Sequence, residues 1–396
     1  MTTVGAFGTG TPRVRQDDDH RWWFVVDPIL IAAAMFITML GIVLVYSATR
    51  GPATELEPAD TSFLERQVFF AVVGVGLAFG AALIDIRRVR RFLPLAYLGL
   101  LGLLAGVLVL GVDRNGARAW YRVAGFTFQP SEPGKLVLIV ALAAVLATSA
   151  VTLGRLMVTL ALAAVPIGLI LLQPDLGTVL VYMTVVAVMV LMSEVRARVI
   201  VLLAIIGLTA LVGLFQSDLL AQYQQDRLTV FLLTDDQLAE LDTSDPLRRV
   251  AYNAEQSQIA IGNGGLGGAG LFAGTQTGSD LVPFQETDWI FSVAGEELGF
   301  RGASVMLAVY ALLLFRIWRI ALRATDLFDR LIAVGVMAMF LFQIFQSAGM
   351  AMGMMPVTGI PLPMVSYGGS SLITSLVALG LVLGVHRRRF DYTERH

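Results

Sequence analysis

Long apolar runs alternate with short polar segments along most of this chain. Each run has roughly the 20 apolar residues that an α-helix needs to cross a bilayer core about 30 Å thick. The runs cover residues 28–48, 67–85, 93–112, 132–151, 156–173, 176–193, 199–215, 289–315, 331–350 and 367–385. Because backbone in lipid must satisfy its hydrogen bonds within helices or closed barrels, the pattern predicts an all-α polytopic membrane protein of about ten transmembrane helices.

The polar segments divide the chain into a tail, a membrane domain and a second tail. Residues 1–27 form the N-terminal tail, residues 28–385 the transmembrane domain, and residues 386–396 the C-terminal tail. The first apolar run is too long for a cleaved signal peptide, so we expect it to remain as a helix. A polar segment at about 216–288 separates the seventh and eighth helices, and connections this long are usually functional or disordered.

Arginines predict how the helices are oriented. One end of the expected bundle, the end that also holds the N-terminus, collects Arg87, Arg88, Arg90, Arg91, Arg196, Arg198, Arg316, Arg319, Arg323, Arg330, Arg387, Arg388 and Arg389. The positive-inside rule makes that end cytoplasmic. With an even number of helices both termini are then cytoplasmic, and the segment 216–288 is a large extracellular loop.

Composition agrees with lipid as the solvent. Hydrophobic residues make up 56% of the chain and charged residues only 15%, with a mean hydropathy of +0.75, outside the usual soluble range. A net charge of -2 gives no reason to expect nucleic acid as a partner. There is no cysteine to form disulfides or thiolate metal sites, and the three histidines fall on the expected cytoplasmic side, where they form no zinc cluster.

A few charged residues remain at membrane level, where each costs several kcal/mol unless it faces a partner or a cavity. These candidates are Glu132, Lys135, Asp175, Asp288, Glu296, Glu297 and Arg301. Most of them fall at the outer ends of the expected helices, so the sequence favours a site that opens outward.

Glu132 and Lys135, the only lysine in the chain, are three residues apart and share one helical face. They could form a structural ion pair, the lysine could snorkel outward, or it could bind phosphate as a compact charge. Asp175 and Asp288 begin helices, which suits a capping residue. A low-dielectric boundary could equally raise the pKa of Asp288 and make it a general base.

Three further features of the sequence have both a structural and a functional interpretation. Glu297 and Arg301 have the spacing and order of a helical ion pair, and Glu296 points about 80° from Asp288 on a helix. The segment 262–267 matches a dinucleotide fingerprint but lacks its strand and helix, so we expect a flexible loop whose backbone a ligand can approach. The outer arginines are either surface charge or binders of a lipid diphosphate; they are Arg66, Arg114, Arg118 and Arg122.

Several spaced motifs resemble one family over nearly the whole membrane region. In chain order they are Phe128-Gln129-Pro130-Ser131-Glu132 with Lys135, Gln173-Pro174-Asp175-Leu176-Gly177, Gln256-Ser257-Gln258-Ile259-Ala260-Ile261-Gly262, Gly274-Thr275-Gln276, Thr287-Asp288-Trp289-Ile290-Phe291, Gly295-Glu296-Glu297-Leu298-Gly299, Pro356-Val357-Thr358-Gly359-Ile360-Pro361-Leu362-Pro363 and Ser366-Tyr367-Gly368-Gly369-Ser370-Ser371. The chain thereby resembles the SEDS proteins, the RodA and FtsW type of cell-wall polymerases.

The resemblance implies a peptidoglycan glycosyltransferase in the cytoplasmic membrane of a bacterium. Such enzymes join lipid II units into glycan strands at the outer face, usually beside a class B penicillin-binding protein that acts as the transpeptidase. The motif 274–276 looks more like the RodA branch, which works in cell elongation and shape maintenance. The essential aspartate of the family falls on Asp288, and its supporting positions fall on Glu132, Lys135, Asp175 and Arg66.

Three positions depart from the pattern of the family. Ala119 stands where an arginine usually precedes the tryptophan, with Arg118 one place earlier. Glu286 replaces a common histidine, and Ser347 replaces a frequent asparagine. These departures are typical of a divergent branch or of an altered substrate preference.

The residues support one mechanism. A diphosphate leaving group needs no proton from an acid, so one carboxylate suffices, unlike the pair in most glycoside hydrolases. We expect Asp288 to be the general base of an inverting transfer, with Lys135, Arg66 and Arg118 binding the diphosphate. A magnesium or manganese ion could be held by Glu132 or Asp175 and the lipid oxygens. The alternatives are a flippase or transporter of the lipid-linked precursor and a non-catalytic scaffold for a transpeptidase.

Overall fold

The computed structural model describes residues 26–51, 60–114, 117–123, 125–148, 150–193, 195–215, 222–234, 237–238, 240, 242, 245–279 and 281–393. Most of the expected N-terminal tail, the last three residues and the start of the expected large loop lie outside these residues. The side chain of Arg114 lies outside them as well.

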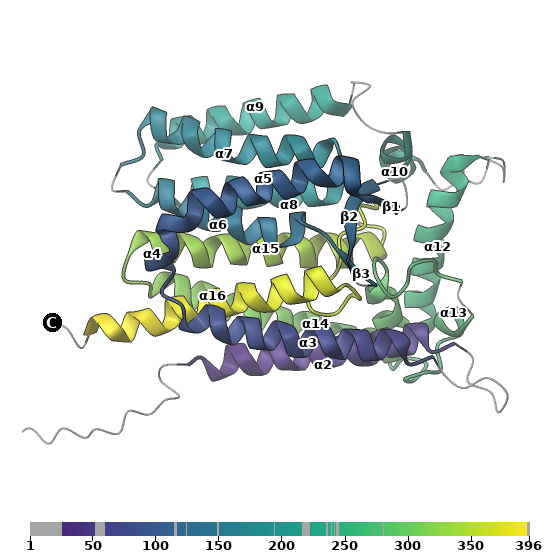
Figure 1. Ribbon diagram of the computed structural model, residues 1–396. Coiled ribbons are helices and arrows are strands. Elements are labelled where there is room, and N and C mark those ends of the chain that lie inside the picture. The colour runs from purple at the N-terminus through teal and green to yellow at the C-terminus, as the bar shows by residue number, and fades with distance from the viewer. Residues whose placement is uncertain are drawn as a thin grey trace, which may run out of the picture.

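Roughly parallel and antiparallel helices form one bundle (Figure 1). They are α2 (Pro28–Thr49), α3 (Ser62–Leu83), α5 (Leu93–Leu110), α6 (Ser131–Leu146), α7 (Leu153–Leu171), α8 (Leu176–Leu191), α9 (Ala197–Phe215), α14 (Ile290–Leu322), α15 (Leu327–Ala351) and α16 (Gly369–Thr393). The short helix α4 (Ile86–Val89) and the turn η1 (Arg90–Phe92) join α3 to α5. Each expected apolar run overlaps one of these helices, and the predicted helical class is confirmed.

Within the described part of the chain, seven helices are long and apolar enough to cross a membrane. They are α2, α3, α4 together with α5, α7, α14, α15 and α16, while α8 is apolar but shorter. The exact number of membrane crossings and their orientation remain predictions from the sequence.

Burial separates an inner helix from outer ones. In its apolar window α15 is 78% buried, against 17% for α3, and α15 packs on α6, α8, α14 and α16. The outer helices present large apolar side chains outward, such as Val72, Phe79 and Leu95. With lipid as the solvent these exposed side chains cost nothing, which explains why the sequence shows so little amphipathic pattern.

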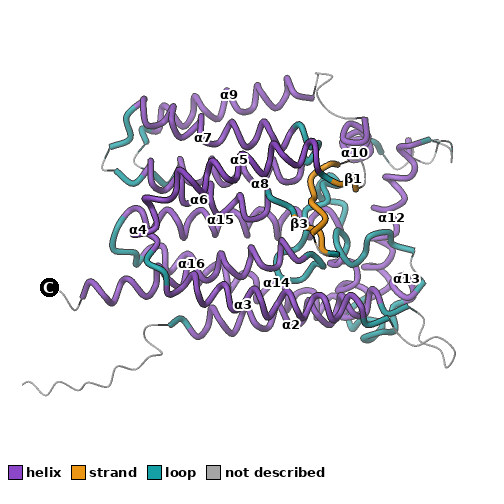
Figure 2. Tube along the Cα trace, viewed as in Figure 1, coloured by secondary structure: helices purple, strands orange, loops and turns teal. Residues whose placement is uncertain are grey.

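One end of the bundle, here called the loop end, carries the connecting structures (Figure 2). They are the strands β1 (Val112–Arg114), β2 (Ala117–Val123) and β3 (Phe126–Phe128) and the helices α10 (Gln222–Leu232), α12 (Pro246–Gly264) and α13 (Thr275–Gly278). The strands pair in the order β1-β2-β3, both pairs antiparallel. This small sheet was not predicted.

The glycine-rich segment after α12 docks on a break in α14. Gly299 has φ of 65°, which interrupts the helical geometry of α14. The backbone N–H groups of Ala269 and Gly270 donate to the carbonyls of Glu296 and Glu297 at 2.9 and 3.0 Å. A Cβ on Gly268 would lie 2.2 Å from the Glu297 carbonyl oxygen, so only glycine fits there. We predicted that a ligand would approach this backbone, but α14 itself does.

The same break overturns the predicted Glu297–Arg301 pair. The two residues lie on opposite sides of Gly299, so the four-residue helical spacing does not hold between them. Arg301 is exposed, whereas Glu297 is buried and accepts a hydrogen bond from the Ser47 hydroxyl. The prediction was wrong because it assumed an unbroken helix.

Glu296 also has a structural task. Its Oε1 accepts from the Gln276 N–H at 2.7 Å and its Oε2 from the Thr277 N–H at 2.8 Å, at the start of α13. The hydroxyls of Thr275 and Thr277 donate to the same carboxylate. Glu296 is fully buried, so these four donors compensate the cost of removing its charge from water.

The opposite end, here called the basic end, is tied together by ion pairs. Arg316 of α14 binds Asp27, which caps α2, with Nη2 2.5 Å from Oδ2. Asp329 of α15 accepts from Arg388 of α16 at 2.7 Å and also contacts Arg87 of α4. These contacts tie the start of α2 to α14 and tie α4 and α16 to α15 at this end of the bundle.

Candidate functional site

Asp288 lies at the loop end, in a turn that precedes α14. Its N–H donates to the Phe284 carbonyl at 3.0 Å. The preceding carbonyl, of Thr287, accepts from the Ser366 hydroxyl at 2.5 Å, and the Glu286 carbonyl accepts from the Tyr367 N–H at 2.8 Å. The turn therefore owes its position to residues 362–367, from the proline-rich segment between α15 and α16, and Asp288 stays partly accessible.

Gly359, in the same proline-rich segment, lies directly against the Asp288 carboxylate. A Cβ at this glycine would lie 3.2 Å from Oδ2 of Asp288 and 3.6 Å from Nη1 of Arg227. The carboxylate and the guanidinium thus flank one point on the backbone. Arg227 belongs to α10 and was missed in the sequence, because nothing in the polar segment around it set it apart.

The neighbouring residues connect Asp288 to the start of α8. A Cβ on Gly177 would lie 2.8 Å from both the Thr358 carbonyl oxygen and Cγ1 of Ile360. The Gln224 side-chain amide, one turn before Arg227, donates to the Pro174 carbonyl at 2.8 Å. The start of α8, the 358–360 backbone and α10 therefore meet, and Asp288 lies next to Gly359 in that backbone.

Asp175 is a helix cap, one of the two interpretations that the sequence left open. Its Oδ1 accepts from the Thr178 N–H at 3.0 Å, and its Oδ2 from the Thr178 hydroxyl at 2.8 Å. The Gln129 amide donates to Oδ2 as well, at 2.9 Å. Capping fixes this carboxylate at the N-terminus of α8 and links it to the segment that enters α6.

Glu132 and Lys135 form a buried ion pair in the first turns of α6. Nζ of Lys135 lies 2.7 Å from Oε1 of Glu132, and their side chains are 2% and 4% exposed. This burial rules out a snorkelling lysine. The Tyr182 hydroxyl of α8 donates to the carbonyl of Ser131 at 2.9 Å, so the pair lies beside the helix that Asp175 caps.

Three buried polar atoms around these carboxylates have no hydrogen-bond partner in the described part of the chain. They are Oγ of Ser131, Oε1 of Gln173 and Oγ1 of Thr358. Unpaired buried polar atoms are rare in native proteins and often mark the place of a water, an ion or a ligand. Their grouping next to Glu132, Asp175 and Gly359 favours a polar site there.

Arg66 and Arg118 are both exposed and differ in their surroundings. Next to Arg66, the Gln67 amide donates to the Ser366 carbonyl at 3.2 Å, which places the start of α3 on the segment that holds the Asp288 turn. The pKa of nearby Asp60 is lowered, mainly by hydrogen bonds from Ser62 and less by Arg66. Arg118 instead donates from Nη1 to the Leu108 carbonyl of α5 at 3.4 Å.

The three residues that depart from the family pattern differ in burial and in their contacts. In β2 the side chain of Ala119 is fully buried while that of Arg118 is exposed. Because neighbouring strand residues face opposite sides, Arg118 does not occupy the place of an arginine at position 119. Ser347 is fully buried, and its hydroxyl has no hydrogen-bond partner in the described part of the chain. Glu286 contributes its backbone carbonyl to the Asp288 turn.

The predicted metal ligands are already engaged by protein groups. Glu132 is bound to Lys135, and both oxygens of Asp175 accept hydrogen bonds. Among the described residues there is no group of three or more His, Asp or Glu side chains that could hold a metal. Glu132 and Asp175 as arranged here therefore do not fit a resident divalent cation, and the metal remains a prediction from the sequence alone.

Fold and site together define a class: a multi-pass helical membrane protein whose polar site lies at one end of its bundle. The model of the FtsW/RodA/SpoVE family of cell cycle proteins matches residues 28–390. The chain belongs to this family, the SEDS glycosyltransferases, and thus to the multi-pass proteins of the bacterial cell membrane.

Relatives and solved structures agree with the family. The chain is 37% identical to stage V sporulation protein E of Bacillus subtilis over 91% of this chain and 97% of that protein. It is 32% identical to the peptidoglycan glycosyltransferase MrdB of Escherichia coli over 92% of this chain and 94% of that protein.

Two solved structures resemble the whole fold. One is a chain of a peptidoglycan synthase complex that coordinates polymerization and crosslinking, with a TM-score of 0.75 and 35% identity over 93% of this chain and 100% of that chain. The other is the rod shape determining protein RodA of Thermus thermophilus, with a TM-score of 0.67 and 34% identity over 93% of this chain and 99% of that chain.

Proposed function

We propose that this chain is a peptidoglycan glycosyltransferase that polymerises lipid II into glycan strands at the outer face of the cytoplasmic membrane. Family membership and the activity named for its relatives support this. The observation that carries the proposal is the position of Asp288. It is a partly accessible carboxylate at the loop end, held by backbone hydrogen bonds and placed beside a guanidinium.

In the proposed reaction, Asp288 takes the proton from the attacking sugar hydroxyl as that oxygen bonds to the anomeric carbon of the second sugar. The bond from this carbon to the diphosphate breaks, and its electron pair leaves with the undecaprenyl diphosphate. Attack from the opposite side inverts the anomeric configuration. A positioned base of this kind contributes about 10²–10⁴-fold to the rate.

The leaving diphosphate needs positive charge, and the proposal assigns that task to Arg66, Lys135, Arg118 and Arg227. Arg227 and Arg66 have the better support, because Arg227 flanks Asp288 and Arg66 is next in sequence to Gln67, whose amide binds the segment that holds the Asp288 turn. Lys135 is buried against Glu132, so its direct contact with substrate requires the pair to open. Its other role is to hold the start of α6 in place. No step needs a metal.

The proposal also covers orientation, partner and pathway. The arginines of the basic end support a cytoplasmic placement of that end, which puts Asp288 outside. Likeness to a chain of a complex that coordinates polymerization and crosslinking supports a class B penicillin-binding protein as the transpeptidase partner. A role in elongation rests on the motif 274–276, and restored rod shape in a rod-shaped bacterium that lacks its own elongation polymerase would test it.

The test uses purified full-length protein and lipid II, with the products separated on a gel. We expect glycan chains from the native protein and none from Asp288→Ala or Asp288→Asn. Asp60→Ala is the matched control, since Asp60 is an exposed aspartate at the start of α3, and it should leave polymerisation unchanged. Glycan chains from Asp288→Ala would refute the mechanism. Movement of lipid II across a vesicle membrane without polymer would favour the flippase, and neither activity would favour the scaffold.

A further inference from the structure

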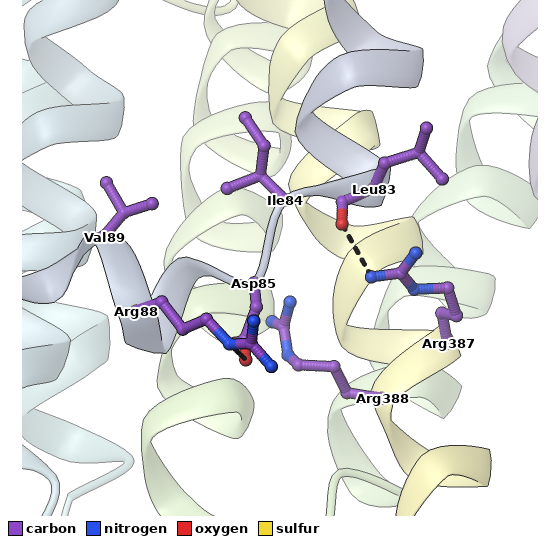
Figure 3. A pocket seen from close by; sticks show the side chains of 7 residues that line it. All are labelled: Leu83, Ile84, Asp85, Arg88, Val89, Arg387 and Arg388. Atoms are coloured by element: carbon purple, nitrogen blue, oxygen red, sulfur yellow. Dashed lines mark hydrogen bonds and ion pairs between the residues drawn. The ribbon is translucent and has the colours of Figure 1, made fainter.

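A cavity of about 410 Å³ opens at the basic end, between the α3–α4 turn and the end of α16 (Figure 3). Its lining includes Leu83, Ile84, Asp85, Arg88, Arg387 and Arg388. Arg387 and Arg388 reach from α16 toward the turn, and Arg88 extends from α4 on the other side. None of these residues has a part in the proposed glycosyl transfer.

The acidic groups nearby do not balance the arginines of the cavity. Arg388 is neutralised by a two-nitrogen contact with Asp329, which is 1% exposed. Arg88 has only Asp85, with Nε 3.3 Å from Oδ2, and its side chain is 84% exposed, so this pair contributes little. Positive charge therefore remains at the mouth of the cavity.

Arg387 is the unbalanced group. Nη2 donates to the Leu83 carbonyl at 2.7 Å, and within the described part of the chain no carboxylate pairs with this guanidinium. Its Nε is buried and has no hydrogen-bond partner there. A buried N–H that donates to nothing is costly, and a guanidinium without an acid calls for an anion.

The surroundings indicate what kind of anion fits. Guanidinium forks match the oxygens of a phosphate group. At the same rim Leu83 and Ile84 are 50% and 49% exposed, so apolar surface adjoins the charged groups. Basic pockets between helices on the cytoplasmic side of a membrane are suited to anionic lipid headgroups. A phospholipid carries both groups that this cavity suits: a phosphate for the arginines and hydrocarbon chains for the apolar rim.

We propose that this cavity binds the phosphodiester headgroup of an anionic membrane phospholipid. Arg387 and Arg88 hold the phosphate, and the acyl chains of the lipid run along Leu83 and Ile84. Arg388 lines the cavity but does not hold the phosphate, because its guanidinium is paired with Asp329.

The test measures lipid binding to the full-length protein in a neutral detergent by native mass spectrometry. The probes are dioleoylphosphatidylglycerol and dioleoylphosphatidylcholine. The double variant R88Q/R387Q removes two guanidinium groups and leaves the Arg388–Asp329 pair intact. Arg155→Gln is the matched control, since it removes an exposed arginine from the first turn of α7, outside the cavity.

We expect the native protein and Arg155→Gln to bind the phosphatidylglycerol at least tenfold more tightly than the phosphatidylcholine, and the double variant to lose this preference. Phosphatidylglycerol should also raise the unfolding temperature of the first two proteins more than that of the double variant. If the double variant has a much lower unfolding temperature than the native protein in phosphatidylcholine, the single variant Arg88→Gln replaces it. We expect the preference of Arg88→Gln for phosphatidylglycerol to be at least threefold weaker than that of the native protein.

Two results would overturn the assignment. One is an unchanged preference for phosphatidylglycerol in the variants that lack the cavity arginines. The other is displacement of the phosphatidylglycerol by millimolar inorganic phosphate, which would make a soluble anion the ligand.

Discussion

Gly359 and Asp288 are in direct contact across the loop end. Gly359 has φ of +71° and lies so close that a Cβ there would be 3.2 Å from Oδ2 of Asp288. The carboxylate thus lies in the space that a side chain would take on a segment about 70 residues further along the chain. Two separate properties of glycine, its allowed positive φ and its missing side chain, are used at this one position.

Gly359→Ala should therefore impair catalysis more than folding. The new methyl group forces the Asp288 carboxylate to shift by a few tenths of an ångström, and since a misplacement of about 1 Å can cost 10²-fold, we expect kcat to fall by about tenfold. Gly51→Ala is the control, because Gly51 has a similar φ of +66° and nothing within 4 Å of a Cβ. Both variants carry the strain of a positive φ, and only Gly359→Ala should lose lipid II polymerisation. Equal activity of the two variants would contradict the proposed contact.

Arg227→Ala should lower turnover while the protein stays folded. Its guanidinium flanks the point that Asp288 also faces, and loss of one group that stabilises developing charge costs roughly 10²-fold in kcat. The control is Arg248→Ala, which removes a partly exposed arginine of α12 from its pair with Glu255. Polymerisation rates at saturating lipid II give the comparison. A change in KM alone would argue for uniform substrate binding instead.

The Glu132–Lys135 pair can be tested by a double-mutant cycle. Removal of one partner leaves a buried charge and should lower the free energy of unfolding by roughly 3–5 kcal/mol. The double variant E132Q/K135M removes both charges and should recover most of that loss. Thermal unfolding measures stability, and the lipid II gel measures activity. Recovery of stability without activity would assign the pair to the reaction, whereas recovery of both would make the pair purely structural.

Glu296→Gln should destabilise the loop end. The carboxylate accepts four hydrogen bonds at the start of α13, and an amide with one oxygen leaves donors unpaired. We expect a loss of about 2–4 kcal/mol in the free energy of unfolding. Glu65→Gln, at an exposed glutamate of α3, should change it by less than about 0.5 kcal/mol. Denaturant unfolding of both variants measures the difference, and an equal effect would refute the capping role.

A manganese titration tests the metal ligands expected from the sequence. Both oxygens of Asp175 accept hydrogen bonds, so Asp175→Asn should leave the manganese concentration for half-maximal activity unchanged. The same variant should lower the unfolding temperature, because the cap of α8 is weakened. Activity that is equal in chelator and in manganese would remove a metal from the reaction. A tenfold rise in the half-maximal concentration would instead place a metal at Asp175.

The sequence was sufficient to predict where the helices lie. A helix that crosses a bilayer must be long and apolar, and such a run can be seen directly in the sequence. It was less informative at the loop end. The strands β1 and β2 flank Asn115-Gly116 in the sequence, a strong hairpin signal that we overlooked. The sequence predicted only a connecting segment between the runs 93–112 and 132–151, because the stretch between them is too short and polar to span a bilayer.

Asp288 and the Glu132–Lys135 pair could be singled out because a charge near lipid is conspicuous. Arg227 could not, since it lies among other polar residues and becomes notable only through its distance to Gly359. Glu297 was paired with the wrong residue, because one positive φ at Gly299 removes the helical spacing on which the pairing rested. Where the chain departs from regular helix, periodicity stops predicting contacts.

The break at Gly299 connects α12 to the helix that follows Asp288. Main-chain hydrogen bonds join the residues after α12 to α14 on both sides of that break, about three turns beyond Asp288. The helix α12 also packs on α10, which carries Arg227. A displacement of α12 would therefore reach the elements that carry Asp288 and Arg227, while ion pairs hold the basic end of the bundle together. We expect a protein that binds at α12 to change the distance between this carboxylate and this guanidinium from the loop end alone.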